Sequence, residues 1–263
     1  NPDITFPSGN TVSNVASSPF HTVSVEVPVQ LTGAAGLQVI DFTIEFTDPD
    51  LNVVTTPVQF SAIANYDVAI NSSASETVEA PLNFLPWTRN ATPAAAQWTR
   101  TEITPLDHRW FGPDSPTTSL TALVTPVLNV GAGSFSFSFT HRYGFEFNKG
   151  TKYDGGVIEI SEDDGVTWTD IGMSASPGYN GRLTTTSGNP LGGRRAYTGD
   201  RALEMVNVNL GTTYSSKAVR IRFLIGTDEA VGSFGWEIDN VAFTGITNTP
   251  FPAVIADTTS CGP

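Results

Sequence analysis

The sequence contains a single cysteine, Cys261, close to the end of its 263 residues. One cysteine excludes a disulfide within the chain, so buried cores must hold the fold together. Two interpretations of Cys261 stay open: half of a disulfide with a segment missing from this sequence, or a neighbour of a C-terminal surface-sorting signal. No secretory signal peptide precedes Asn1-Pro2-Asp3, which suggests a fragment of a longer secreted precursor.

Charged residues are also few, and basic ones are the scarcer kind. They make up 15% of the chain, with 13 Lys and Arg against 26 Asp and Glu and a formal net charge of −13. A field of this sign repels nucleic-acid phosphates and anionic membrane surfaces, so neither is expected as a partner. The same field suits metal cations, especially calcium, which binds oxygen ligands.

Several motifs are missing as well. No run of 18 apolar residues is present, so no membrane span is expected. Neither H-E-x-x-H nor G-x-S-x-G occurs, and the three histidines, His21, His108 and His141, stand far apart. The catalytic centres of zinc peptidases and of serine hydrolases with a nucleophile elbow are therefore excluded from this chain. His141 continues the phase of an aromatic strand and is expected to be a packed or hydrogen-bonded core residue.

The sequence does contain strong β-strand patterns and no helical period. Apolar and polar residues alternate over residues 23–32, 40–47 and 58–70. A period of two predicts half-buried strands. Turn-forming residues separate them at Gly33–Gly36 and Asp48–Asp50, and the polar stretch Asn71–Glu76 follows. This spacing predicts an immunoglobulin-like (Ig-like) β-sandwich over residues 1–75.

A second and more aromatic part covers residues 76–248. All five tryptophans lie in it, and aromatic residues share one phase over residues 135–147. A strand so long and aromatic belongs in the middle of a large sandwich. We therefore predict an all-β chain in which a jelly-roll β-sandwich follows the Ig-like one, with residues 249–263 as a tail or linker.

An Asp box lies within this second part. Its pattern S-x-D-x-G-x-T-W is carried by Ser161, Asp163, Gly165, Thr167 and Trp168. Such a motif folds a β-hairpin, because the aspartate accepts hydrogen bonds from the turn backbone and the glycine takes a positive φ. The tryptophan anchors the second strand. One copy predicts a hairpin and no propeller.

Carboxylates near this hairpin could serve glycoside hydrolysis, which uses a pair of acids. The candidates are Glu159 and the neighbours Asp163 and Asp164. Capping and solvation beside a turn already explain them. A glycan-cleaving enzyme is therefore the least favoured function.

Two irregularities stand out against the strand pattern. The buried phase of Trp236 and Ile238 is opposite to that of Val241 and Phe243, which predicts a bulge at Asp239–Asn240. Bulges re-aim side chains, so the Asp239 carboxylate is expected to point where a regular strand would not place it.

The second irregularity is the segment 173–200, rich in Gly, Ser, Thr, Asn and Pro. A connection this long without regular structure is usually functional or mobile. Arginine and tyrosine are frequent at binding surfaces, and the segment offers a candidate ligand-binding loop. Its residues are Tyr179, Arg182, Arg194, Arg195 and Tyr197. The alternative is that the arginines balance nearby acids.

From about residue 78 to residue 250 the chain resembles a known module. The resemblance rests on His141-Arg-Tyr143, Tyr153–Ser161, Asn189–Gly193, Arg220–Phe223 and Gly235–Gly245. This set is similar to the MAM-like jelly-roll modules that follow the catalytic domain in secreted bacterial metallopeptidases of the fungalysin and immune-inhibitor types. The resemblance implies a lectin-like jelly roll, a parent metallopeptidase domain, and a structural calcium site near the sheet edge. Where that family often has Asp-Asp, this chain has Asp239-Asn240.

Calcium is also the sharpest chemical hypothesis from the residues themselves. Asp154 precedes two glycines that would let carbonyls approach an ion, Asp239 lies at the expected bulge, and Glu79 opens the first strand of the jelly roll. Asp228 is a further candidate ligand. Calcium takes several oxygen ligands at once, so acids from distant segments suit it. The alternative is that each acid caps a turn or faces water.

These observations support a non-catalytic binding or adhesion module, secreted or displayed on a bacterial cell surface. Its expected partner is a protein or glycan of a matrix or cell surface, to which it would bring its parent catalytic domain. The alternative is a structural spacer or assembly subunit of the cell surface without a ligand of its own.

Overall fold

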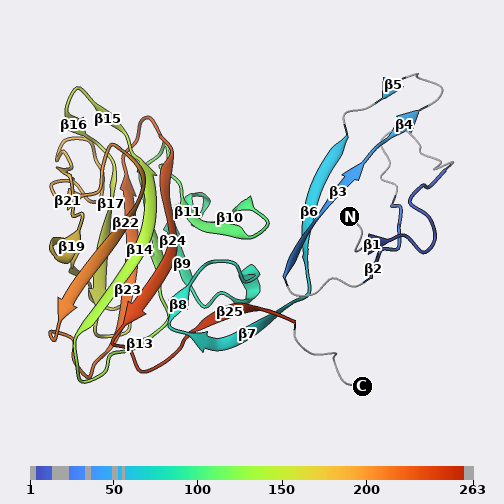
Figure 1. The fold of residues 1–263 in the computed structure, drawn as a ribbon. Coiled ribbons are helices and arrows are strands. Elements are labelled where there is room, and N and C mark those ends of the chain that lie inside the picture. Colours follow the sequence, from blue (N-terminus) through green and yellow to red (C-terminus); the bar gives the residue numbers. More distant parts are fainter. Residues whose placement is uncertain (1–3, 14–23, 33–36, 49–52, 55–56, 258–263) are drawn as a thin grey trace. The chain divides into compact units, whose positions relative to one another are not determined.

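The computed structural model describes residues 4–13, 24–32, 37–48, 53–54 and 57–257. Cys261, the expected turn at 33–36, Pro49-Asp50 and residues 1–3 lie outside them. The chain is all-β, as predicted, and divides into two compact units, residues 1–67 with 255–263 and residues 68–254 (Figure 1). None of the helices among the described residues is long and apolar enough to cross a membrane.

The first unit consists of two-stranded ribbons in its described residues. The pairs are β1 (Ile4–Thr5) with β2 (Gln30–Leu31), β3 (Gln38–Ile44) with β6 (Val58–Ala64), and β4 (Thr47–Asp48) with β5 (Val53–Val54). Phe42 stacks on Phe60 across the β3–β6 pair at 4.9 Å between ring centroids. The described ribbons do not form two packed sheets, so the Ig-like arrangement stays a prediction for this segment.

The prediction of a strand over residues 23–32 is wrong for most of the described residues. Only Gln30–Leu31 is a strand there, and Val25 is 47% exposed. Alternation prepares one face of a strand, but a strand also needs a partner for its backbone groups. In the described residues that partner is β1, which covers two positions.

The second unit contains two large sheets. The strand order of the first is β10-β11-β24-β14-β22-β19, with β8 also paired to β24, and that of the second is β18-β17-β23-β12-β9, with β13 also paired to β23. The first sheet comprises β8 (Ser75–Glu76), β10 (Thr99–Thr104), β11 (Asp107–Gly112), β14 (Phe135–Gly144), β19 (Ala175–Ser176), β22 (Asp200–Gly211) and β24 (Gly235–Thr244). The second comprises β9 (Thr88–Thr92), β12 (Ser119–Val124), β13 (Leu128–Asn129), β17 (Gly155–Ser161), β18 (Thr169–Asp170) and β23 (Ala218–Thr227).

An aromatic core joins the two sheets into a sandwich. Phe223 of β23 meets Phe139 of β14 at 5.0 Å and Trp236 of β24 at 5.7 Å between ring centroids, both edge to face. Such pairs add to the stabilisation from burial alone. The strand β14 lies between β24 and β22, which confirms its expected central place (Figure 1). It ends at Gly144, however, and Phe147 is 45% exposed.

Several short elements complete the unit. Three short 3-10 helices are η1 (Leu82–Phe84), η2 (Ala94–Ala96) and η3 (Gly172–Ser174), and β15 (Phe147–Asn148) pairs with β16 (Thr151–Lys152). The segment 173–200 was expected to lack regular structure, yet it holds β19 and the pair β20 (Gly181–Arg182) and β21 (Arg195–Ala196).

Residues 249–263 were expected to form a tail, but part of them is a strand. β25 (Phe251–Ala256) pairs with β7 (Tyr66–Ser73). Phe251 is fully buried and stacks on Phe243 at 5.6 Å. Burial of a large apolar side chain such as Phe251 stabilises the folded chain, and this burial favours a strand over a tail at these residues.

The structure confirms the Asp box. Ser161 Oγ accepts the Gly165 amide at 2.8 Å, and Asp163 Oδ1 accepts the Thr167 amide at 2.8 Å. Gly165 has a φ of +95°, which a side chain would oppose. Trp168 Nε1 donates to the Gly165 carbonyl at 2.9 Å, and its ring is partly buried against the core.

The expected bulge in β24 is also confirmed. The register between β14 and β24 shifts between Ser138 and Thr140, and Asn240 has a φ of +50°. The shift lets Ile238 and Val241 both face the interior, where both are fully buried.

Candidate metal centre

A cluster of acids lies where several strands of the second unit end. Oxygen atoms of Glu146, Asp154 and Asp228 lie within 4.8 Å of one another. Glu146 follows β14, Asp154 precedes β17, and Asp228 follows β23. A fourth acid, Asp114, comes two residues after β11. Its charge raises the pKa of Asp154, and the charge of Glu146 raises the pKa of Asp114. The fold therefore brings together acids that are far apart in the chain.

Asp154 and Asp114 each have one carboxylate oxygen held by hydrogen bonds from the surrounding chain. Asp154 Oδ1 accepts the Asp228 amide at 2.8 Å and Asn189 Nδ2 at 3.0 Å. Asp114 Oδ2 accepts the backbone amides of Glu146 and Ser233, both at 3.0 Å. These bonds orient the carboxylates before any ligand arrives.

The remaining oxygens are buried and have no hydrogen-bond partner among the described residues. They are Asp114 Oδ1, Glu146 Oε2, Asp154 Oδ2 and Asp228 Oδ1. A buried polar atom without a partner is costly, and native proteins hold few of them. Four acceptors of one kind in one place form a cluster that could hold a cation.

The pKa values of these acids reflect the same lack of compensation. Burial, and after it the charge and a hydrogen bond of the neighbouring Asp114 carboxyl, raise the pKa of Asp154 to about 8. Burial likewise raises the pKa of Asp114 to about 6. The pKa of Glu146 is raised by burial and then by the charge of Asp228. Each shift opposes the charged form, which a bound cation would favour.

The donor set fits calcium. Calcium takes six to eight oxygen ligands at about 2.3–2.6 Å, so two ligands of one ion are at most about 5 Å apart. The 4.8 Å limit on the three acids meets this condition. Carboxylates are hard ligands, and no sulfur or imidazole belongs to the group.

The predicted ligand set is therefore split. Asp154 and Asp228 are together, as expected, but Glu79 and Asp239 lie elsewhere. Glu79 binds His108, its two oxygens accepting the backbone amide at 3.1 Å and contacting Nδ1 at 2.8 Å. His108 is near the start of β11 and Asp114 is past its end, about 20 Å along an extended chain. Glu79 cannot reach the cluster.

Asp239 has local partners instead. Its oxygens accept the Asn240 backbone amide at 2.6 Å and Asn240 Nδ2 at 2.7 Å. Burial raises the pKa of Asp239 to about 6, with the charges of Asp107 and Glu79 adding to the rise. The bulge thus re-aims this carboxylate into its own turn, at the opposite end of β11 from the cluster.

Glu146 and Asp114 were not predicted. The signal that could have found them is an acid placed just after a strand, at the tip shared with Asp154 and Asp228. The two glycines after Asp154 also have another role than the one expected. A Cβ at Gly156 would lie 2.3 Å from the Trp236 ring. At Gly155 an added Cβ would lie 2.6 Å from the Tyr197 carbonyl oxygen. Gly156 thus makes room for a core ring and Gly155 for a neighbouring backbone segment.

The predicted ligand-binding loop is divided between core and surface. Tyr179 and Tyr197 are buried; the Tyr179 hydroxyl accepts the Ile158 amide at 2.7 Å, and the Tyr197 hydroxyl donates to the Pro177 carbonyl at 3.0 Å. Arg194 bridges Glu159 and Asp170, each at 2.7 Å.

Arg182 and Arg195 are the exposed members of that loop. Arg182 donates to the Gly193 carbonyl and Arg195 to the Tyr179 carbonyl. The two tyrosines pack inside because their large rings contribute most when buried, which sequence composition alone does not separate from surface display.

No family model matches the chain, and a search of curated proteins finds no match. Similar solved structures include a carbohydrate-binding module of the β-sandwich superfamily, at 12% identity and a TM-score of 0.37 over 92% of this chain and 83% of that chain. Another is the K1 cleaved adhesin domain of Lys-gingipain from Porphyromonas gingivalis W83, at 13% and 0.37 over 68% and 98%. TmCBM61 in complex with β-1,4-galactotriose is similar at 10% and 0.32, over 69% and 89%. At these values the similarity says nothing of what this chain binds.

Proposed function

We propose that residues 68–254 form a non-catalytic, calcium-stabilised binding module of an extracellular protein. The observation that carries the proposal is the set of four buried carboxylate oxygens, from four separate segments, that lack partners among the described residues. A bound calcium ion would join the segments after β11, β14 and β23 to the one before β17. In this role the ion stabilises the sandwich and takes no part in a reaction.

The side chains that could have served catalysis have structural roles, which supports a binding function. Glu159 is held by Arg194 and Arg222, and Asp163 closes the Asp-box turn. His141 is fully buried; its Nδ1 accepts Trp236 Nε1 at 3.2 Å, and its Nε2 faces Glu204. These groups are engaged by neighbours and are not poised toward a substrate.

The wider setting proposed for the module follows from the sequence resemblance. It is secreted or held on a bacterial cell surface, and it brings a parent metallopeptidase domain to a protein or glycan. A protein with a net charge of −13 accommodates divalent cations readily, and extracellular calcium is abundant enough to occupy weak sites.

Calcium binding to the whole chain tests the proposal. After treatment with a chelator and dialysis, titration calorimetry with CaCl₂ is expected to show one site. At a calcium concentration one hundred times the Kd, mass action stabilises the fold by about 2.7 kcal/mol, which corresponds to a rise in Tm of roughly 5–10 °C. Absence of both a binding heat and a Tm shift at 10 mM calcium would disprove the site.

A further inference from the structure

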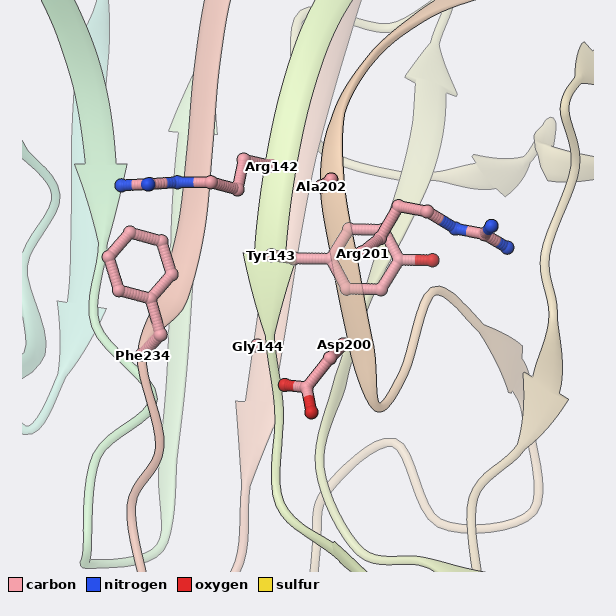
Figure 2. A pocket seen from close by; sticks show the side chains of 7 residues that line it. All are labelled: Arg142, Tyr143, Gly144, Asp200, Arg201, Ala202 and Phe234. Carbon is pink, nitrogen blue, oxygen red and sulfur yellow. The ribbon is translucent and has the colours of Figure 1, made fainter.

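A hollow of about 320 Å³ lies at the ends of β14 and β22, apart from the acidic cluster. Its lining includes Arg142, Tyr143 and Gly144 of β14, Asp200 and Arg201 of β22, and Phe234 just before β24. Figure 2 shows Arg142 beside the Phe234 ring on one side of β14, Tyr143 and Arg201 on the other, and the Asp200 carboxylate next to Gly144.

Gly144 lets Asp200 and Phe234 lie close to the end of β14. A Cβ at this position would lie 3.0 Å from Asp200 Oδ1 and 3.0 Å from Phe234 Cβ. Asp200 and Phe234 therefore flank the buried glycine, and a side chain there would press on both.

The polar groups around Gly144 include both acceptors and donors. The Asp200 carboxylate is exposed and has no hydrogen bond or ion pair within the described part of the chain. Arg142 donates to Glu237 at 2.7 Å, and its side chain is 43% exposed, so it has further N–H donors. A ligand at this place meets the Asp200 carboxylate and the remaining donors of Arg142, whereas Arg201 lies with Tyr143 on the other side of β14.

An apolar surface stands beside these groups. Phe234 is 40% exposed, and the Arg142 guanidinium lies 4.4 Å from its ring centroid. Arg142 is held in turn by Glu237 at 2.7 Å. The ring is thus fixed in orientation, which lowers the entropy lost when a ligand packs on it.

The charges select the class of ligand. The guanidinium groups of Arg142 and Arg201 oppose a cation. Asp200, Glu204 and Glu237, together with the net charge of −13, oppose an anion. A neutral ligand with many hydroxyl groups can donate to Asp200, accept from Arg142 and lay C–H groups on the exposed part of Phe234.

We propose that this hollow binds a neutral glycan through Asp200, Arg142 and Phe234, which meet beside Gly144. The inference deepens the proposed binding function and depends on it. A volume near 320 Å³ is at the lower end for ligand sites, which suits one or two sugar rings of a longer chain.

The acidic cluster shares two segments with the hollow. The Ser233 amide donates to Asp114 Oδ2 at 3.0 Å, and Ser233 immediately precedes Phe234. Glu146, a member of the cluster, comes two residues after Gly144. Calcium at the cluster therefore fixes both sides of the hollow, and its removal is expected to weaken glycan binding.

The experiment is a titration of the whole chain, in calcium, with cellotriose, mannotriose and xylotriose as neutral probes and trigalacturonate as the anionic comparison. At least one neutral probe is expected to bind. Gly144→Ala, Asp200→Asn and Phe234→Ala are each expected to weaken it about tenfold or more, since each removes a contact or fills its space. Lys217→Ala, which changes an exposed cationic residue outside the hollow, is the matched control and is expected to bind as the parent does.

Unchanged binding in all three hollow variants, at an unchanged Tm, would overturn the site. Preference for trigalacturonate over every neutral probe would overturn the ligand class. If none of the probes binds while the chain still takes up calcium and binds a matrix protein on a protein array, the glycan inference fails and the proposed function stands. Equal glycan affinity in chelator and in calcium would overturn the coupling between cluster and hollow.

Discussion

The backbone amide of Asp228 donates to Asp154 Oδ1 at 2.8 Å, while Oδ2 of the same carboxylate is buried without a partner among the described residues. One hydrogen bond therefore joins the end of β23 to the start of β17 and aims a charged oxygen into the acidic cluster. Such an arrangement costs free energy unless something neutralises it. Calcium is the neutralising ion that the oxygen ligands favour.

Replacing Asp154 by Asn is expected to remove most of the stabilisation by calcium. Asn keeps an acceptor for the Asp228 amide but removes one of the crowded charges. Without calcium, D154N is expected to melt at the same temperature as the parent or above it, and addition of calcium is expected to raise its Tm little. Differential scanning calorimetry in chelator and in calcium checks both points.

The matched control for this change is Asp239→Asn. Asp239 is another partly neutralised acid with a raised pKa, but it lies in the bulge and away from the cluster. D239N is expected to keep the full rise in Tm with calcium. If D239N lost the rise in Tm with calcium and D154N kept it, the ion would bind near Asp239, and the prediction for the acidic cluster would be wrong.

The Asp box is expected to contribute acid sensitivity. Hydrogen bonds from Thr167 and Ser161 hold the pKa of Asp163 at about 2, below its usual range. Because the folded state binds this proton less readily than the unfolded state, the stabilisation is complete above about pH 4 and is lost as the pH falls towards 2. Asp163→Asn is expected to be less stable at pH 6 and to lose less stability below pH 4.

Chemical denaturation at pH 6, 4 and 3 measures this difference. Asp164→Asn is the control, because Asp164 is exposed and pairs with Arg220 at the surface. Parallel pH profiles for D163N and the parent would contradict the role of Asp163.

His141 is expected to stay neutral in the folded protein well below pH 6. Burial, and after it the charge of Arg201, lower the pKa of His141 to about 3. The unfolded chain binds the proton near pH 6.5, so this group costs stability progressively as the pH falls from 6.5 towards 3. NMR of the imidazole nitrogens at pH 7, 5 and 4 is expected to show one neutral tautomer with the proton on Nε2; titration near 6.5 would be the opposite result.

Gly156→Ala tests the close packing of the core. The new methyl group would lie 2.3 Å from Cζ3 of the fully buried Trp236, so the ring would have to move. Overpacking of this kind costs about 1–3 kcal/mol or more. Gly133→Ala is the control, because no atom lies within 4 Å of its added Cβ and its φ is not positive. Equal Tm values for the two variants would contradict the packing described.

Much of the local structure could be predicted from sequence because its causes are local. The Asp box spans eight residues, and its hydrogen bonds join Ser161, Asp163, Gly165 and Thr167 within that span. The bulge at Asp239–Asn240 was visible as a change of phase in one strand. The period of two predicted β14 for the same reason, since side chains alternate along any strand.

The errors fall where the outcome depended on distant partners. Alternation over residues 23–32 predicted a strand, but in its described part only two residues pair. Tyr179 and Tyr197 carry the residue type of a binding surface, yet they complete the core between Ile158 and Trp236. A side chain's type limits its roles, and the neighbours supplied by other strands choose among them.

The sequence by itself determined the β class, the hairpin, the bulge, the acidic field and the absence of the two catalytic motifs, because each is a property of one segment or of composition. Only the tertiary structure decided which acids meet. Glu146 and Asp114 joined Asp154 and Asp228, and Glu79 and Asp239 did not, because strand pairing within each sheet and packing of the two sheets place the ends of β11, β14 and β23 near the start of β17. A site assembled from four segments is set by sheet register, which no single segment contains.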